Sequence, residues 1–228
     1  MQKSKFSFKF RRHMKNYYPK DKIDYNVIEK RSKLPEKKIK SLMKFPRDYF
    51  DGKRQYGYGG YYYNKKYFRK LVRHFIKFYK LKPKDKILDI GCAKGFTLFE
   101  FKHLMPSLDI YGVDISKYAI KNAKKEVKQN LKCLNCTKLP YEDNYFDFVF
   151  SLSTIHNLSV PAIKQALTEM IRVSKKKYFL YVKAFHNLKQ KKDMTNWNIV
   201  SKTCLSEKDW ITILQNKNYN GDIEWSKF

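Results

Sequence analysis

The sequence predicts an α/β fold built on a doubly wound, mainly parallel sheet with helices on both faces. From about residue 84 onward, short apolar runs alternate with segments in which apolar residues recur at three-to-four spacing. Strands that alternate with crossover helices are typical of parallel sheets covered on both faces. The length of 228 residues and the hydrophobic content of 43% are sufficient for one domain with a full core.

The strands and helices of this fold can be placed in order along the chain. The first helix is expected at 65–80, where Asn64 can cap its start and apolar residues repeat with helical spacing. A Ser116 cap and a Ser206–Asp209 start signal mark two later helices. The expected strands are 87–90, 110–113, 146–150, 178–182 and 223–228, and the expected helices are 65–80, 95–104, 116–128, 162–173 and 206–215.

The N-terminal part of the chain differs from the rest in charge and in pattern. Residues 1–60 carry 18 basic and 6 acidic side chains, a net charge of +12, and their apolar residues are sparse and interrupted by prolines. We interpret residues 1–55 as a basic extension with one or two short helices, and residues 56–228 as the α/β domain.

The net charge of +29 invites a nucleic-acid or anionic-membrane interpretation. Only 8 of the 50 basic residues are Arg, however, whereas proteins that read phosphates and bases rely on the planar donor fork of Arg. The abundance of Lys, Tyr, Phe, Ile and Asn is typical of AT-rich coding sequences. A nucleic-acid partner is therefore possible but not favoured.

Several other classes are disfavoured by simple patterns. No apolar run approaches the roughly 18 residues of a membrane span, and no secretory signal follows the basic N-terminus, so we expect a cytoplasmic protein without a membrane span. Cys133 and Cys136 have zinc-knuckle spacing, but no second Cys or His pair follows at a matching distance. We therefore expect no metal site, and the sequence favours no particular oligomeric state.

The most informative stretch is Ile87–Phe96, in which a strand ends in an acid and a glycine-rich turn opens a helix. Ligands of doubly wound sheets bind at the carboxyl ends of strands, where glycine lets the backbone approach them. Asp114 ends the next expected strand, 23 residues beyond Gly91, which is about the spacing at which an acid meets ribose hydroxyls.

With these motifs the sequence resembles the class I S-adenosylmethionine-dependent methyltransferases, in particular small-molecule methyltransferases like those of ubiquinone biosynthesis. Ile87–Phe96 is similar to their first signature, Asp114 to their ribose-binding acid, and Asn135–Ser151 to their third and fourth signatures. The resemblance implies S-adenosyl-L-methionine as the cofactor, with Asp89 near its methionine amino group. The cofactor-binding residues it implies are Asp89, Gly91, Ala93, Gly95, Asp114, Ile115, Asn135, Cys136 and Ser151.

Two positions depart from the family pattern. Ala93 stands where many members have a second glycine, and its methyl group narrows the turn. Asn135 stands where many members have an Asp facing the adenine amino group. The side-chain carbonyl of Asn135 can still accept that hydrogen bond, so we expect modestly weaker cofactor binding.

The segment Ser151–Leu158 occupies the region that lines the acceptor pocket in similar enzymes. His156 is the candidate general base, because imidazole titrates near neutral pH, and Asn157 is a candidate acceptor-binding residue. The alternative is that His156 only packs or hydrogen-bonds near the cofactor. The segment lacks the Asn/Asp-Pro-Pro-aromatic loop of enzymes that methylate exocyclic base amines, which favours a small-molecule acceptor.

The glycine-tyrosine segment Tyr56–Tyr63 is a candidate lid over cofactor and acceptor. Its glycines allow motion, and Tyr56, Tyr58 and Tyr61 could present aromatic faces to a cation. The alternative is a packing segment that is rich in tyrosine only through codon composition.

The sequence thus predicts an enzyme that transfers a methyl group from S-adenosyl-L-methionine to a small-molecule acceptor through oxygen or nitrogen. One alternative is methylation of RNA or of a nucleic-acid-associated protein, with the basic N-terminus as a tether. A second alternative is a cofactor-binding subunit without catalysis of its own.

Overall fold

The structure, a computed structural model, describes residues 8–14 and 23–227. Within these residues, seven strands form one sheet in the order β1-β7-β6-β5-β2-β3-β4, and every neighbouring pair is parallel. The predicted α/β fold with a mainly parallel sheet is therefore confirmed. The strands are Lys9–Phe10 (β1), Lys86–Ile90 (β2), Asp109–Asp114 (β3), Leu131–Cys133 (β4), Phe148–Leu152 (β5), Tyr178–Ala184 (β6) and Asp222–Lys227 (β7).

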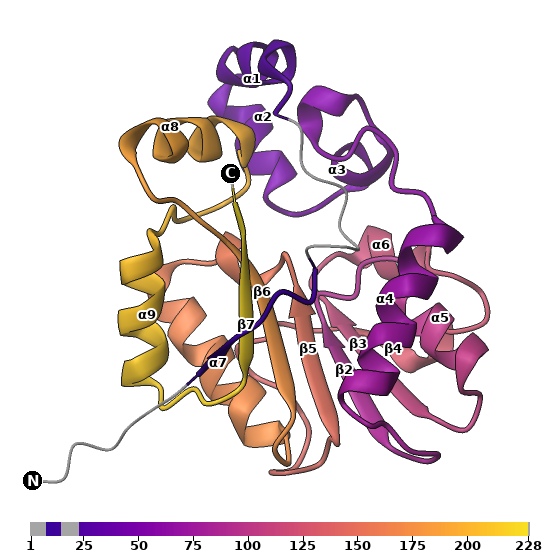
Figure 1. The fold of residues 1–228 in the computed structure, drawn as a ribbon. Helices are drawn as coiled ribbons and strands as arrows, with labels where there is room; N and C mark the ends of the chain where they lie inside the picture. The colour runs from indigo at the N-terminus through magenta and orange to yellow at the C-terminus, as the bar shows by residue number, and fades with distance from the viewer. Residues whose placement is uncertain (1–7, 15–22, 228) are drawn as a thin grey trace, which may run out of the picture.

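Helices cover both faces of the sheet (Figure 1). On one face α4 (Lys65–Phe78) and α5 (Phe96–Leu104) pack on strand residues such as Ile87 and Phe148. On the other face α7 (Val160–Val173) and α9 (Glu207–Asn216) pack on neighbours such as Leu88. Because successive side chains of a strand point to opposite faces, these strands are apolar along their whole length.

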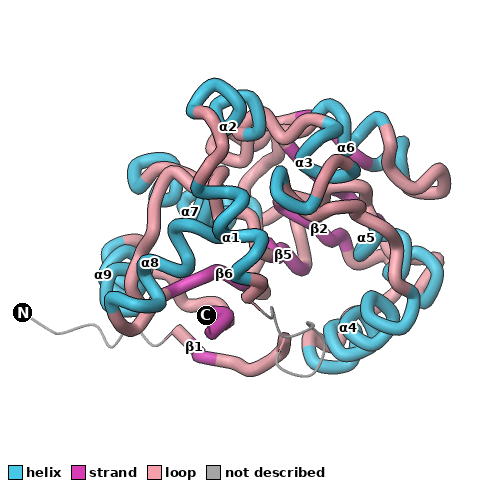
Figure 2. Tube along the Cα trace, turned by 90° about the horizontal axis from the view of Figure 1, so that it is seen from above, coloured by secondary structure: helices cyan, strands magenta, loops and turns pink. Residues whose placement is uncertain are grey.

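A third group of helices lies above the carboxyl ends of the strands (Figures 1 and 2). It consists of α1 (Tyr25–Ser32), α2 (Glu36–Leu42), α3 (Arg47–Asp51) and α8 (Leu188–Trp197), and we call it the helical cover. Val27 and Ile28 of α1 pack against Trp197 of α8, so the cover joins two segments that are far apart in the sequence.

The remaining short elements connect the strands. They are α6 (Lys117–Lys121) and the 3-10 helices η1 (Arg54–Tyr56), η2 (Lys128–Asn130) and η3 (Ile155–Asn157). None of the helices in the described residues is both long and apolar enough to cross a bilayer.

The predicted helix 116–128 is wrong in its extent. Ser116 does cap α6, but the helix ends at Lys121, and the Lys124 N–H donates to the Lys94 carbonyl at 3.0 Å instead of continuing the helical ladder. The chain thus leaves the helix to close against the glycine-rich turn. The predicted strand 146–150 begins two residues later than expected, because Phe146 forms only an isolated bridge with Ser174.

The N-terminal segment contributes directly to the sheet. Lys9 and Phe10 pair with Asp222 and Ile223 of β7, a strand that the sequence analysis did not predict. The segment also holds three helices rather than one or two. Residues 1–7 and 15–22 of the expected extension, and Phe228 of the expected last strand, lie outside the described residues.

Candidate active site

A cavity of about 470 Å³ lies at the carboxyl ends of β2, β3 and β5, beneath the helical cover. We call it the cofactor cavity. Strand ends and the turns after them form its floor, and residues of the cover and of the glycine-tyrosine segment form its roof. Its lining includes Asp89, Gly91, Ala93, Asp114, Ile115, Asn135, Cys136, Ser153, Thr154 and Asn157 from below and Tyr49, Phe50, Tyr58 and Tyr61 from above.

The turn after β2 has left-handed backbone at three positions. Gly91, Ala93 and Gly95 have φ values of 85°, 47° and 72°. A Cβ at Gly91 would lie 2.0 Å from the Thr154 Oγ1, so only glycine fits there. Ala93 takes the same region with a methyl group, and its N–H donates to Asp114 at 2.8 Å. Gly95 starts α5 and does not line the cavity.

Asp114 lies at the carboxyl end of β3 and lines the cavity. One carboxylate oxygen accepts the Ala93 N–H and the other accepts the Ser116 N–H, each at 2.8 Å. Burial raises the pKa of Asp114, while these two backbone N–H groups oppose the increase. Each oxygen retains a lone pair, so the fixed carboxylate can accept two further hydrogen bonds from a ligand.

Asp89 lies at the carboxyl end of β2, and its side chain is 3% exposed. It lines the cavity, and no residue in the described part of the chain donates a hydrogen bond to its carboxylate. Burial and the nearby Asp114 raise its pKa well above the usual value. A buried acid without a partner is costly, and a cationic donor in the cavity would relieve that cost.

The far end of the cavity is formed by residues that follow β3 and β4. Ile115 is 53% exposed and lines the rim. Asn135 holds its turn by accepting the Thr137 N–H at 3.0 Å. Cys136 lines the wall, and burial raises the pKa of its thiol to about 11.

The glycine-tyrosine segment covers this cavity. Tyr58 and Tyr61 line it with ring centroids 4.6 Å apart, and Tyr61 stacks on Phe96 at 5.1 Å. Tyr56 does not line the cavity, and the Lys38 Nζ lies 4.2 Å from the centroid of its ring. The segment therefore covers the cavity and also packs against the domain.

A partly buried ion pair attaches the helical cover to the glycine-rich turn, and the sequence analysis missed it. The Lys94 ammonium lies 2.7 and 2.8 Å from the two carboxylate oxygens of Asp51, which also accepts the Tyr118 hydroxyl and the Tyr61 N–H. Burial opposes ionisation, but the hydrogen bonds from Lys94 and Tyr118 outweigh it and lower the pKa of Asp51. No sequence pattern marks a pair that is 43 residues apart.

Ser151 and His156 also lie outside the cofactor cavity, as Gly95 and Tyr56 do. Ser151 is fully buried in β5, where its hydroxyl donates to the Ile90 carbonyl at 2.9 Å. The His156 ring is also buried and lines a neighbouring cavity, and burial together with nearby Lys183 lowers its pKa well below the usual value. Asn157 lines both cavities, and its Oδ1 accepts from Asn198 at 2.8 Å.

The parallel sheet and the helices on its two faces form the Rossmann-like fold of class I methyltransferases. The YcgJ protein of Bacillus subtilis superposes with a TM-score of 0.54 over 64% of this chain and 66% of its own, at 21% identity. The 4+2 cyclase SpnF superposes with a TM-score of 0.54 over 69% of this chain and 60% of its own, at 19% identity. These likenesses show the fold alone.

Residues 88–182 match the family model described as a methyltransferase domain. An uncharacterized methyltransferase of Schizosaccharomyces pombe is 33% identical over 107 residues, which are 42% of this chain and 38% of that protein. A demethylmenaquinone methyltransferase of Symbiobacterium thermophilum is 32% identical over 114 residues, 46% of this chain and 45% of that protein. Each match spans less than half of the relative's length.

Proposed function

We propose that this protein binds S-adenosyl-L-methionine in the cofactor cavity and transfers its methyl group to a small-molecule acceptor. The observation that carries the proposal is the pair Asp89 and Asp114, two carboxylates at the ends of adjacent strands that face one cavity. Asp89 lacks a hydrogen-bond donor within the described residues. Asp114 is held by the Ala93 and Ser116 N–H groups and retains free lone pairs.

The residues of the cavity fit this cofactor. Asp89 would hold the methionine ammonium group, which would neutralise its buried carboxylate. Asp114 would accept the two ribose hydroxyls, and Asn135 would accept from the adenine amino group beside Cys136. The glycine-rich turn brings backbone close to the methionine end, where the Gly91 position leaves no room for a side chain.

The cofactor supplies an electrophilic sulfonium methyl group when it is bound. The chain's own contribution is to hold the reacting groups in line and to exclude water. Tyr58 and Tyr61 form the roof, so their ring faces can stabilise a cationic centre by roughly 0.5–2 kcal/mol.

A small-molecule acceptor is supported by the enclosure of the site. The helical cover and the tyrosine segment lie over the cavity, which favours a ligand that can be enclosed over a polymer. Relatives matched over a similar segment include a demethylmenaquinone methyltransferase and a phosphoethanolamine N-methyltransferase, the latter of Arabidopsis thaliana and 35% identical over 99 residues.

The proposal is tested first by calorimetric titration of the full chain with S-adenosyl-L-methionine. We expect saturable binding that Asp114→Asn weakens about tenfold to a hundredfold, because two charge-assisted hydrogen bonds are lost. The control is Asp109→Asn on the same strand, whose side chain is exposed and should bind as the unaltered protein does. Equal affinity of all three proteins would contradict the proposal.

Methyl transfer itself is tested with methyl-labelled cofactor and two acceptor pools, a metabolite extract and total RNA. We expect label in small molecules, detected by mass spectrometry. Label in RNA alone would support the tether alternative, and cofactor binding without transfer to either pool would support a non-catalytic subunit.

A further inference from the structure

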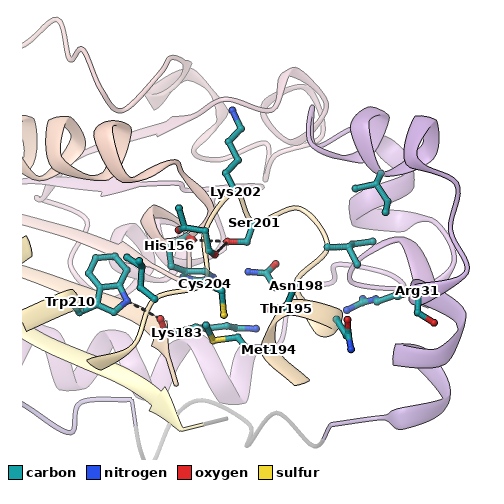
Figure 3. Close-up of a pocket in the computed structure, with 16 residues that line it drawn as sticks. Arg31, His156, Lys183, Met194, Thr195, Asn198, Ser201, Lys202, Cys204 and Trp210 are labelled. Atoms are coloured by element: carbon teal, nitrogen blue, oxygen red, sulfur yellow. Dashed lines mark hydrogen bonds between the residues drawn. The ribbon is translucent and has the colours of Figure 1, made fainter. Parts of the chain in front are cut away.

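Two smaller cavities, of about 350 and 100 Å³, lie beside the cofactor cavity and below the helical cover. They share Arg31, His156, Lys183, Asn198 and Ile199 in their walls, so we treat them together as the basic cavity. Figure 3 shows the residues that line the larger one. The smaller one also shares Tyr49, Tyr58, Ser153, Asn157 and Val200 with the cofactor cavity. The two sites therefore meet at a common wall.

The charge of the basic cavity has one sign. Arg31 and Lys183 line both of its parts, and Arg54 lines the part next to the cofactor cavity. None of the residues described as lining it is acidic. These positive charges repel one another more strongly inside a protein than they would in water.

Arg31 is the most deeply placed of these cations, at 4% exposure. Its guanidinium donates to the carbonyls of Arg54 at 3.0 Å and Gly57 at 2.9 Å, and also to that of Trp197. Within residues 8–14 and 23–227, no carboxylate forms an ion pair with it. Burial, together with Arg54, lowers its pKa to about 10.

The two guanidinium groups are held close to each other by one aromatic ring. The Arg31 and Arg54 guanidinium carbons lie 4.7 and 4.9 Å from the centroid of Trp197. A buried cation without an acid is costly, and clustering a second one beside it adds to that cost. The Arg31 guanidinium is bound to backbone carbonyls, which carry no compensating negative charge, so an anionic group beside the two cations would offset their charge.

His156 adds an unused hydrogen-bonding group to the same wall. Its ring is 5% exposed, and the Nδ1 is buried and without a partner in the described part of the chain. The positive charge of Lys183, together with burial, disfavours a second proton on this ring. Neutral imidazole still carries one N–H that can donate to an anion.

We propose that the basic cavity binds a carboxylate or phosphate group of the methyl acceptor. This inference rests on the proposed function, and it names the substrate class as an anionic small molecule. The anionic group would lie among Arg31, Arg54 and Lys183, and the rest of the acceptor would extend past Asn157 and Tyr58 to the cofactor cavity.

The placement favours a small anion over a nucleic acid. The Arg31 side chain of α1 is buried against Trp197 of α8, whereas the phosphates of a polymer are met by exposed cations along an open surface. The basic cavity is also of a size that suits part of a metabolite.

The first test separates acceptors by charge. The full-length protein and methyl-labelled cofactor are incubated with a metabolite extract that anion exchange has divided into retained and unretained fractions. We expect label in the retained fraction. Label only in the unretained fraction would overturn this inference and leave the proposed function standing, whereas label in neither would count against the proposed function.

The second test measures the basic cavity without any methyl transfer, and it decides the inference if no label is found. The full-length protein is titrated by calorimetry with inorganic phosphate and, separately, with malonate. We expect saturable binding of at least one anion, and the stronger of the two indicates whether phosphate or carboxylate is the preferred group. Saturation by neither would overturn the inference.

Matched variants locate the binding. Lys183→Met should weaken it about tenfold, whereas Lys192→Met, a change of the same kind at an exposed position of α8, should not. An equal loss in both variants would show non-specific attraction and overturn the inference. We do not substitute Arg31, because its guanidinium joins α1, η1 and α8 and its loss could unfold the cover.

Discussion

The cofactor cavity and the basic cavity meet at Asn157 but carry opposite charges. Asp89 and Asp114 line the first, and Arg31, Arg54 and Lys183 line the second. A sulfonium cofactor with an ammonium group suits the acidic side, and an anionic acceptor suits the basic side. Under the proposed function, this difference in charge would direct the cofactor and the acceptor to different sides of the shared wall.

The two cavities also differ in origin. The acids stand at the ends of adjacent strands within residues 88–182, the segment that matches the methyltransferase domain model. Arg31 and Arg54 come from the N-terminal segment that forms most of the helical cover. We infer that the sheet supplies cofactor binding and that the cover supplies acceptor specificity, so each can be altered separately.

The largest expected loss of folding stability comes from removing the Lys94–Asp51 ion pair, which joins the helical cover to the glycine-rich turn. Lys94→Met leaves the partly buried Asp51 without its cation, and we expect a loss of about 1–3 kcal/mol because its carboxylate loses two charge-assisted hydrogen bonds. Urea unfolding should show this loss. Lys175→Met is the matched control, because Lys175 pairs with Asp147 at the surface, where such a pair contributes about 0–1 kcal/mol. Equal losses in the two variants would mean that the link does not hold the cover.

The next prediction separates the effect of Asp89 on folding stability from its effect on cofactor binding. Because burial and Asp114 raise the pKa of Asp89, the folded state binds its proton more tightly than the unfolded state does, and stability falls as the pH rises through that range. Asp89→Asn removes this penalty. At pH 7 we expect a higher melting temperature together with cofactor affinity reduced about tenfold to a hundredfold.

The matched control for this experiment is Asp85→Asn, a half-buried carboxylate just before the same strand that accepts the Lys82 N–H and does not line the cofactor cavity. It should leave cofactor affinity unchanged. If Asp89→Asn lowers both the melting temperature and the affinity, Asp89 is a structural acid rather than a ligand for a cation.

The sequence predicted the elements whose pattern is local. The strands β2, β3, β5 and β6 contain apolar runs, and α4 and α9 carry their own caps at Asn64 and Ser206, so periodicity and capping identified them. The sequence analysis missed α8, a Lys-rich helix in which only Met194 and Trp197 are buried, and the short strands β1 and β4, which have two and three residues. Their structure comes from tertiary contacts.

The same distinction applies to the site. The turn residues and Asp114 were found because strand, turn and acid follow one another in the chain. The basic cavity was not, because Arg31, Arg54 and Lys183 are distant in sequence and only the packing of α1 on α8 brings them together. Ser151 and His156 were placed by a motif, but the end of β5 directs Ser153 and Thr154 into the cofactor cavity instead.

A smaller effect on folding stability is expected from His156, which lines the basic cavity. Burial and Lys183 hold the pKa of His156 well below its usual value, so the unfolded chain gains a proton below about pH 6.5 that the folded chain does not. Stability is therefore lost as the pH falls, by at most about 1.4 kcal/mol per pH unit from this residue. His156→Gln should lose less stability between pH 7.5 and 5.5 in urea unfolding, and the exposed His103→Gln should behave as the unaltered protein does. Identical losses in all three proteins would contradict the prediction.

The last prediction compares the reactivity of two thiols, that of Cys136, which lines the cofactor cavity, and that of Cys133, which does not. Cys133 is exposed at the end of β4, whereas Cys136 faces the cavity with a pKa raised to about 11 by burial. Because the thiolate is the reactive form, iodoacetamide at pH 8 should modify Cys133 at least about tenfold faster, as followed by peptide mass spectrometry. S-adenosyl-L-methionine should slow modification of Cys136 further and leave Cys133 unchanged. Protection of Cys133 with no effect on Cys136 would indicate that the adenine does not lie against Cys136. That result would contradict the proposed orientation of the cofactor.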